Sequence, residues 1–403
     1  MRPALKPGLL PVWRNRDTLQ IGIDSRRAVA LTGMAGAAAV IRLLDGSRDR
    51  AQVIRGAVDQ GIPADVAERV LALLAASGAL NDFPAGTLRV LPAPLRARLA
   101  AELATASLAN GDSDGGARTL ARRIAAQVRL YGGGRVADGI AGLLVAAGVG
   151  SVLPEGGPVR APKPATRTDA ASGMNPAAGM NPAAKTVRKA AKDPSAGRTP
   201  HAGRTSGAAG SSRAAGTQSA AGAQRAATTG RAPARRRAAG PGRAAKTAAA
   251  AAEGAAGPGS RPDLAILIGR HSLERRARLM RAQIPHLAAS ADEAIGIVGP
   301  LVIPGLTACL TCLDLTRADR DPAWPLILAQ LEGRHPDPPA CDAPLAAAVA
   351  AQAAAQALAF IDREARAGPV ADGTLELVLP GWQWRRRTWP RHNDCSCGSY
   401  TYP

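Results

Sequence analysis

The chain has 403 residues, which exceeds one average domain, so its length predicts two or more structural units. Its net charge of +20 and its aromatic content of 2% are averages over two unlike parts. Residues 161–260 hold 16 Lys/Arg and 3 Asp/Glu and lack Leu, Ile, Phe, Trp, Tyr and Cys, whereas the other 303 residues carry only +7. A segment without large apolar side chains cannot offset the entropy lost on ordering. A single compact domain of 403 residues is therefore excluded.

Targeting signals and cysteine usage predict the compartment. No run of 18 uninterrupted apolar residues occurs, and the first 17 residues lack the apolar block of a secretory signal. We therefore expect a cytoplasmic protein without a membrane span. In a reducing compartment, clustered cysteines indicate a metal site before they indicate disulfides. All five lie in the last hundred residues: Cys309, Cys312, Cys341, Cys395 and Cys397.

The N-terminal 85 residues predict a small domain of winged-helix type. Residues 17–23 (DTLQIGI) alternate like a strand, and residues 27–31 can pair with them across a turn at Asp24 and Ser25. Apolar residues at helical spacing follow this hairpin. They predict three helices, over residues 35–44, 50–60 and 64–76.

A glycine turn is the most informative pattern before residue 160. Residues 127–131 predict a strand, residues 138–147 a helix and residues 148–153 a second strand. The intervening turn fits G-x-G-x-x-A, with Gly132, Gly134 and Ala137 in the small positions. Small residues there permit a tight turn, the close approach of a phosphate and helix–strand packing. The alternative is a tight turn that holds no ligand.

Residues 161–260 predict a disordered, basic, low-complexity insert. It contains a tandem GMNPAA repeat at residues 173–184 and is densest in charge at residues 235–237 (RRR). Salt-dependent binding of nucleic acid or another polyanion is one interpretation. We favour a solvated loop without a partner, because the segment has no aromatic side chain to stack on bases.

Ordered sequence resumes at residue 261. Residues 263–268 are an almost continuous apolar run, typical of a buried parallel strand. Further elements are expected toward the C-terminus, without a membrane-spanning one among them. They are an Arg-rich helix at 272–283, a short strand at 284–287, two β segments at 294–304 broken at Gly299 and Pro300, a packing helix at 343–361 and a strand at 375–379.

Four of the cysteines form two close pairs. Cys309 and Cys312 make a C-x-x-C knuckle, and Cys395 and Cys397 make a C-x-C pair. Four thiolates satisfy a tetrahedral zinc ion, and such a closed site is structural. The alternatives are four metal-free thiols, or a site in which His392 replaces one thiolate. We interpret Cys341 as a small residue at a helix entry, because no base stands beside it to activate a nucleophile.

Two sequence segments resemble those of the ThiF/MoeB family, relatives of the ubiquitin-activating enzymes. They are residues 143–152 (LLVAAGVGSV) and residues 299–305 (GPLVIPG), the latter followed by Thr307 and Cys309. The second segment resembles a branch associated with azole-forming cyclodehydratases. The resemblance implies a Rossmann-like core, ATP on the glycine turn, a tetrathiolate zinc site and a dimer interface near helix 343–361. It also implies a YcaO-type partner protein that performs the ATP chemistry.

Residues 17–82 resemble the recognition domain of modified-peptide biosynthesis. That resemblance implies that the leader segment of a precursor peptide is held as an added strand beside the third helix, with main-chain bonds for affinity and side-chain pockets for specificity. The alternative is a domain that only packs against the rest of the chain.

The chain departs from the ATP-using family members at three places. The Asp that holds ribose has only Glu155 as a substitute, and the stretch bearing a phosphate-binding Arg is missing. The family's magnesium-ligating Asp matches Leu267, and an apolar side chain cannot ligate Mg²⁺. Phosphoryl chemistry depends on positioned charge and metal. We expect weak ATP binding at most and no adenylation, and we assign no catalytic residue.

The sequence therefore predicts an α/β protein with a Rossmann-like ThiF-type core, an N-terminal winged-helix-like peptide-recognition domain and a disordered insert. The predicted function is to bind a precursor peptide and present it to a YcaO-type cyclodehydratase. The alternatives are an active ThiF-type adenylyltransferase and, as the weakest, a nucleic-acid-binding protein. The predicted segments are the recognition domain (1–85), a helical connector (86–122), the first half of the core (123–160), the insert (161–260) and the second half of the core with the zinc knuckles (261–403).

Overall fold

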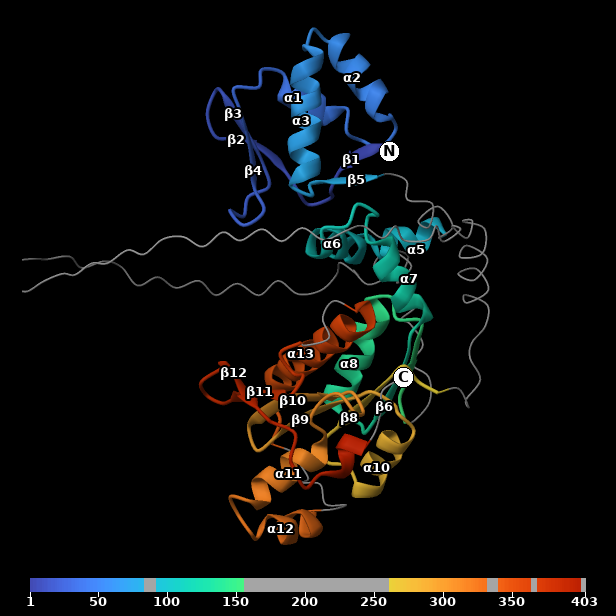
Figure 1. The fold of residues 1–403 in the computed structure, drawn as a ribbon, viewed down its shortest axis with the longest axis vertical. Coiled ribbons are helices and arrows are strands. Elements are labelled where there is room, and N and C mark those ends of the chain that lie inside the picture. The colour runs from blue at the N-terminus through green and yellow to red at the C-terminus, as the bar shows by residue number, and fades with distance from the viewer. Residues whose placement is uncertain (83–91, 156–260, 332–339, 364–367, 400–403) are drawn as a thin grey trace, which may run out of the picture. The chain divides into compact units, whose positions relative to one another are not determined.

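The computed structural model of the protein describes residues 1–82, 92–155, 261–331, 340–363 and 368–399 (Figure 1). The predictions of a disordered insert at 161–260 and of helix at 86–91 lie outside the described residues. The described residues form an N-terminal α/β group, three connecting helices and an α/β core.

The N-terminal group combines a three-stranded antiparallel sheet with three helices. The sheet has the order β2-β3-β4, and a separate two-stranded sheet joins β1 to β5. The predicted strand pair (β3 with β4) and the three predicted helices are present, whereas β1, β2 and β5 were not predicted. The elements are β1 (Pro3–Leu5), β2 (Pro11–Trp13), β3 (Thr18–Ile21), β4 (Val29–Thr32), α1 (Ala37–Arg42), α2 (Arg50–Val58), α3 (Ala64–Ala76) and β5 (Leu80–Asp82).

Local signals fix the helices of this group. Asp49 and Gln52 form a reciprocal capping box at the start of α2: each side chain accepts a hydrogen bond from the other's backbone N–H at 2.8 Å. Helix α3 places Val70 and Leu74 on its buried face, in one apolar cluster with Leu19 of β3 and Leu31 of β4. The sheet and the helices therefore share one core.

The described residues that follow, from residue 92 to 125, are mainly helical. Their helices are α5 (Ala93–Arg98), α6 (Ala100–Asn110) and α7 (Ala117–Ala125). Helix α7 begins after Gly116, where an added Cβ would lie 2.6 Å from the carbonyl oxygen of Leu103 in α6. The turn between α6 and α7 is therefore tight enough to require glycine.

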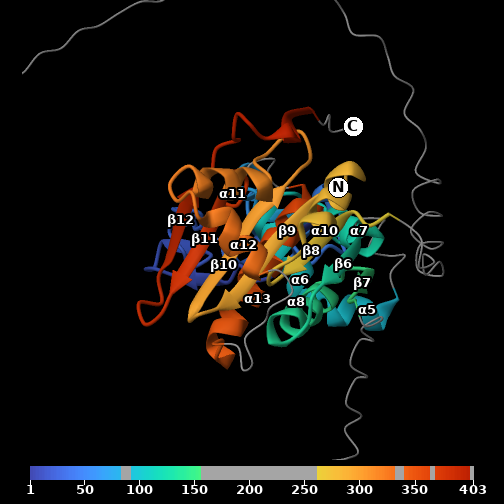
Figure 2. The same cartoon turned by 90° about the horizontal axis from the view of Figure 1, so that it is seen from below.

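The core is a seven-stranded mixed sheet of order β12-β11-β10-β9-β8-β6-β7. The strands from β7 to β9 are parallel and those from β9 to β12 are antiparallel. Helices α8 and α13 cover one face, and α10 and α11 cover the other (Figures 1 and 2). The elements are β6 (Gln127–Tyr131), α8 (Arg135–Ala146), β7 (Ser151–Leu153), β8 (Leu264–Ile268), α10 (Leu273–Arg281), β9 (His286–Asp292), β10 (Ile295–Val302), α11 (Leu310–Ala318), α12 (Trp324–Leu331), α13 (Ala343–Asp362), β11 (Gly373–Val378) and β12 (Trp384–Thr388).

Strand β8 confirms the prediction of a buried parallel strand. All five of its residues are buried, and it pairs in parallel with both β6 and β9. Leu264 and Ile266 belong to the apolar cluster that includes α8 and α13, whereas Leu267 packs with Leu279 of α10. An apolar run is needed here because helices cover both faces.

The prediction of two β segments at 294–304 is wrong, because β10 is one strand. Its pairing with β9 shifts register between Val298 and Leu301, where Gly299 and Pro300 interrupt the ladder. Gly299 has φ +105°, and an added Cβ would lie 2.6 Å from the carbonyl oxygen of Gly373. A bulge absorbs the proline and lets the strand continue. The short strand expected at 284–287 is likewise longer, as β9.

Among the described residues, one helix, α13, is long enough and apolar enough to span a membrane, judged by length and composition alone. Half of its most apolar window is buried, and its Leu345, Val349 and Ala353 are fully buried against the sheet and α8. This burial identifies α13 as the packing helix that the sequence predicted. A cytoplasmic location and a homodimer stay predictions.

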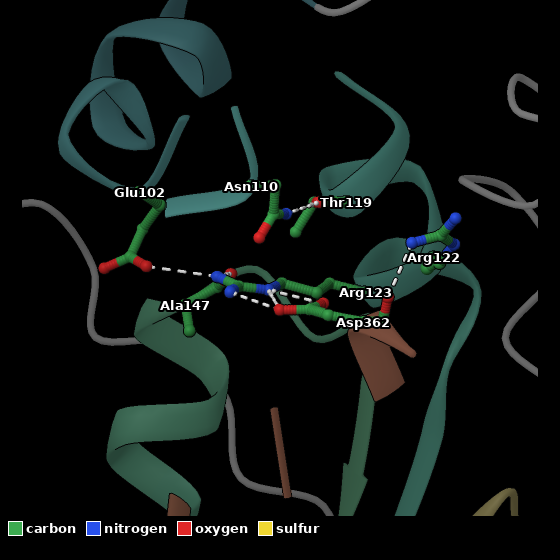
Figure 3. Close-up of polar contacts among 7 residues, drawn as sticks. All are labelled: Glu102, Asn110, Thr119, Arg122, Arg123, Ala147 and Asp362. Carbon is green, nitrogen blue, oxygen red and sulfur yellow. Dashed lines mark hydrogen bonds and ion pairs between the residues drawn. The ribbon is translucent and has the colours of Figure 1, made fainter. Parts of the chain in front are cut away.

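A buried ion-pair network joins the connector to the core (Figure 3). Arg123 of α7 pairs with the carboxylate of Asp362, the last residue of α13, at 2.6 Å, and both side chains are at least nine-tenths buried. Arg123 also contacts the carboxylate of Glu102 at 3.1 Å and donates to the carbonyl oxygen of Ala147. Arg122 donates to the main-chain carbonyl of Asp362. The network fixes four helix ends against one another, those of α6, α7, α8 and α13.

Candidate functional site

The glycine turn lies between β6 and α8, at the carboxyl ends of the parallel strands. Gly132 has φ +100°, and an added Cβ would lie 2.4 Å from the carbonyl oxygen of Ile268, so β8 approaches too closely for a side chain. At Gly133, Gly134 and Gly269 an added Cβ would meet no atom within 4 Å. The turn therefore borders open space, as a site for a ligand requires.

Ala137 and Glu155 take different places around this turn. Ala137 is buried in the first turn of α8 and serves helix–sheet packing. The Glu155 carboxylate accepts a hydrogen bond from the Gly132 N–H at 3.0 Å, so the structure brings Glu155 to the turn. A carboxylate of the chain itself thus occupies a main-chain donor that an anionic ligand would otherwise use.

Arg275 of α10 completes this arrangement and was not predicted. Its guanidinium lies 2.7 Å from the other oxygen of Glu155 and 4.7 Å from the ring centroid of Tyr131. The Arg275 guanidinium, against the opposing effect of burial, holds the pKa of Glu155 below its ordinary value. A cation is therefore present at the turn, although the expected Arg-bearing stretch after β7 is missing. The only signal in the sequence was the Arg-rich helix after β8.

Two more basic residues follow β8. Arg270 lies 3.4 Å from Glu293 and 4.0 Å from Asp292, which close the turn between β9 and β10. Burial, followed by the charge of Arg275, lowers the pKa of His271 to about 4. Nε2 of His271 is buried and has no hydrogen-bond partner within the described residues. The segment after β8 therefore brings three basic residues near the glycine turn. Two of them, Arg270 and Arg275, are paired with carboxylates of this chain.

The magnesium position carries no carboxylate. Leu267, the position at which the ThiF resemblance implies a metal-binding Asp, is 1% exposed and packs against α10. Within the ranges that the structure describes, the only group of three or more His, Cys, Asp or Glu side chains that converge is the cysteine cluster. The glycine turn therefore has no converging set of three carboxylates.

The four cysteines come from two distant segments and meet at one point. Cys309 precedes α11 and Cys312 lies in its first turn, while Cys395 and Cys397 lie in the C-terminal segment that ends in a 3-10 helix (Ser396–Ser399). All four sulfurs lie within 4.8 Å of one another. The distances are 3.8 Å for Cys309–Cys312, 3.5 Å for Cys309–Cys395 and 3.4 Å for Cys312–Cys397.

These distances fit a tetrathiolate metal ion. A tetrahedral zinc ion with bonds of about 2.3 Å separates its sulfurs by roughly 3.8 Å. The hydrogen bond between Cys309 and Cys312 raises the pKa of the Cys309 thiol and lowers that of Cys312 to about 4, so one sulfur of the pair is favoured as a thiolate. Close thiolates require a cation, and the four cysteines can hold a metal ion such as zinc.

Neighbouring candidates have other partners. His392, the alternative ligand, has Nε2 at 2.9 Å from Asp319, and its Nδ1 accepts a hydrogen bond from the Asp394 N–H. Cys341 lies outside the cluster, and burial raises the pKa of its thiol, which disfavours a nucleophile. Trp389, one of the aromatics near the basic C-terminal strand, is 1% exposed and donates to Thr374, so it packs rather than stacking on a ligand.

Comparison with protein-family models and with curated proteins finds no match. Solved structures do match over nearly the whole chain. The Escherichia coli MccB structure with MccA-N7isoASN is 12% identical, with a TM-score of 0.55, and the match covers 99% of this chain and 100% of MccB. The chain therefore shares its fold with a protein whose structures also include a complex with N-formylated MccA.

Two heterocyclases match as well, over part of their length. The heterocyclase TruD is 14% identical, with a TM-score of 0.53, over 98% of this chain. A heterocyclase in complex with substrate and cofactor is 13% identical, with a TM-score of 0.54, also over 98%. The match covers only 43% and 39% of those longer chains. Identities of 11–14% establish a common fold, here a mixed α/β fold around a seven-stranded sheet.

Proposed function

We propose that this chain binds a ribosomal precursor peptide and presents it to a separate YcaO-type cyclodehydratase, without adenylating the peptide itself. The fold likeness to heterocyclases and to MccB supports a ThiF-like role in azole natural-product biosynthesis. The chain spans less than half of each heterocyclase that it matches.

The observation that carries the noncatalytic part is the chemistry at the end of β8. Mg²⁺ needs hard oxygen ligands, and the matching position holds the buried side chain of Leu267. The carboxylate nearest the turn, Glu155, is engaged by Arg275 and by the Gly132 N–H. A site without a positioned metal cannot neutralise the charge that develops at a transferring phosphoryl or nucleotidyl group.

The peptide-binding part rests on β4, an edge of the N-terminal sheet. Gly33 N–H donates to the Asp17 carbonyl, so alternation directs the main-chain groups of Leu31 toward β3 and those of Ala30 and Thr32 toward the open edge. Helix α3 packs beside β4 and supplies the second wall. An extended peptide can therefore add as a fourth strand, with side chains alternating toward α3.

The cysteine cluster has a structural role in this proposal. Cys309, Cys312, Cys395 and Cys397 would hold a zinc ion, which supplies four metal–sulfur bonds between α11 and the C-terminal segment and leaves no open coordination position. Trp389 packs in the same apolar cluster as the cysteines. The metal would therefore fix the C-terminal segment to the core.

Peptide binding is tested with the Ala30→Pro variant, which removes an outward N–H without placing a side chain in the core. A fluorescent precursor peptide, encoded beside the gene for this chain, should bind the wild type and lose at least tenfold in affinity in the variant. Trp13→Ser, on the opposite edge of the same sheet, is the matched control and should bind normally. Equal binding by all three proteins would contradict the assignment of the peptide to β4.

A second candidate, an ATP-dependent ThiF-type adenylyltransferase, is favoured by the position of Glu155. Its carboxylate lies at the turn, next to open space at Gly134 and Gly269, where an acidic side chain can accept from ribose hydroxyls. Equilibrium dialysis against ATP separates the candidates. The noncatalytic proposal predicts weak binding that Mg²⁺ does not tighten, whereas an adenylyltransferase would bind Mg·ATP more tightly than ATP.

A further inference from the structure

The second edge of the N-terminal sheet exposes an apolar strand. All three residues of β2 are exposed, with Trp13 at 59%, and the flanking Leu10 and Ile23 are 58% and 75% exposed. β2 is only three residues long, contains Pro11 and is followed by Arg14, features that limit uncontrolled edge pairing, but its apolar side chains remain exposed. Apolar side chains gathered at an exposed edge mark an interaction surface.

Both faces of this edge are apolar. Trp13 lies opposite Leu19 and therefore on the helix side of the sheet, whereas Val12 lies opposite Gln20 on the outer side. Alternation places Leu10 with Val12 and Pro11 with Trp13. A strand added to β2 would consequently bury apolar contacts on each of its faces.

The main chain of β2 has free bonding capacity. Gly22 N–H donates to the Leu10 carbonyl and Arg14 N–H donates to the Thr18 carbonyl, so the positions between them, Pro11 and Trp13, direct their main-chain groups away from β3. No other strand of the described residues pairs with this side of β2. Trp13 thus offers one donor and one acceptor, and Pro11 offers one acceptor.

The charge beside β2 selects the occupant. Arg14 and Arg16 are exposed in the following turn, and neither has an ion-pair partner within the described residues; Asp17 is the one acidic residue of that turn. At the other end, Asp24 is already paired with Arg26 at 2.7 Å. The net charge of the turn is therefore positive, because it holds Arg14 and Arg16 against Asp17, and the complementary segment is acidic.

We infer that β2 binds an extended, acidic segment of the separate modifying protein, which leaves β4 free for the precursor peptide. This inference rests on the proposed function, which requires the chain to hold two partners at once. The two edges suit different occupants: β4 has α3 alongside it as a groove wall, whereas β2 packs against β3 and presents open apolar faces. One three-stranded sheet would thus join the peptide to the modifying protein.

The test uses the full-length chain and a defined probe, a fluorescein-labelled twelve-residue peptide of alternating Glu and Val. Fluorescence anisotropy should show at least tenfold tighter binding of this peptide than of its Lys/Val counterpart. Trp13→Ser should weaken binding at least tenfold, and Ala30→Pro should leave it unchanged. The double charge reversal Arg14→Glu with Arg16→Glu should invert the preference between the two peptides, and it keeps the assignment testable if Trp13→Ser fails to fold.

Equal affinity for both peptides, no binding of either, or loss of binding in Ala30→Pro alone would overturn the inference. Precursor-peptide binding is measured on the same proteins, so that failure of the β2 inference can be told apart from failure of the proposed function. Normal precursor binding without Glu/Val binding contradicts the β2 assignment alone. Absent precursor binding with normal Glu/Val binding contradicts the proposed function alone.

Discussion

The glycine turn and the cysteine cluster differ in how the protein satisfies their polar groups. At the turn, Glu155 bonds the Gly132 N–H and Arg275 pairs with Glu155, so charge is balanced within the chain. At the cluster, three sulfur–sulfur distances are 3.4–3.8 Å, and all four sulfurs lie within 4.8 Å of one another. The comparison teaches that two sites in one fold can satisfy their polar groups in different ways. The cluster has the chemistry of a site that a metal ion would fill, whereas at the glycine turn Glu155 and Arg275 already satisfy part of the hydrogen-bonding and charge.

The largest expected effect comes from breaking the cysteine cluster. Cys312→Ser should abolish bound zinc and destabilise the protein by on the order of 5 kcal/mol, because a structural metal contributes its binding energy to folding. Metal content by mass spectrometry and unfolding by urea measure both effects. Cys341→Ser, which changes the fifth cysteine, is the control and should retain one zinc per chain. A wild-type protein purified without stoichiometric metal would refute the zinc assignment.

The buried network of Figure 3 provides a second contrast with the half-exposed Glu155–Arg275 pair. Asp362→Ala should cost about 3 kcal/mol of unfolding free energy, because it leaves the Arg123 guanidinium buried without its carboxylate. Glu102→Gln should cost less than about 1 kcal/mol, since that side chain is 39% exposed. Urea unfolding curves measure both values. Similar losses in the two variants would show that Asp362 is not the main partner.

The turn itself can be tested with neighbouring glycines. Gly132→Ala should destabilise the protein by about 2 kcal/mol, because the new Cβ would lie 2.4 Å from the carbonyl oxygen of Ile268 and φ is +100°. Gly133→Ala faces open space and should be close to neutral. Thermal unfolding of the two variants gives the difference. Equal stability would mean that β8 does not approach the turn as closely as described.

The smallest effect concerns protonation at the turn. His271 should titrate by NMR near pH 4 rather than near its ordinary value of about 6.5, mainly because burial disfavours its charged form. The folded-state pKa of this base lies below the unfolded one. The stability contribution is therefore complete above about pH 6.5 and is lost as pH falls toward 4. A midpoint near 6.5 would show that the ring is solvated, and His286, which is fully buried, serves as the reference for a depressed midpoint near 4.

Much of the fold follows from local pattern, and much of the site does not. The continuous apolar run of residues 264–268 predicts β8, because a strand covered on both faces needs apolar side chains at every position. The helical spacing of apolar residues in 64–76 predicts α3, because only one face of that helix is buried. The two close cysteine pairs predict the convergence of Cys309 with Cys395, because four thiolates satisfy one metal ion. The contacts of Arg275 with Glu155 and of Arg123 with Asp362 could not be predicted, because they join residues that only the tertiary structure makes neighbours. The continuity of β10 through Gly299 and Pro300 could not be predicted either, because it depends on pairing with the neighbouring strands β9 and β11.

Exchange of labelled pyrophosphate into ATP tests the central claim most directly, that this fold holds a peptide without activating it. Purified full-length protein, loaded with zinc, is incubated with Mg²⁺, ATP, labelled pyrophosphate and the precursor peptide. The account predicts exchange no faster than in a protein-free blank, while the same sample binds the peptide. Rapid, peptide-dependent exchange that disappears in Gly134→Val would contradict it.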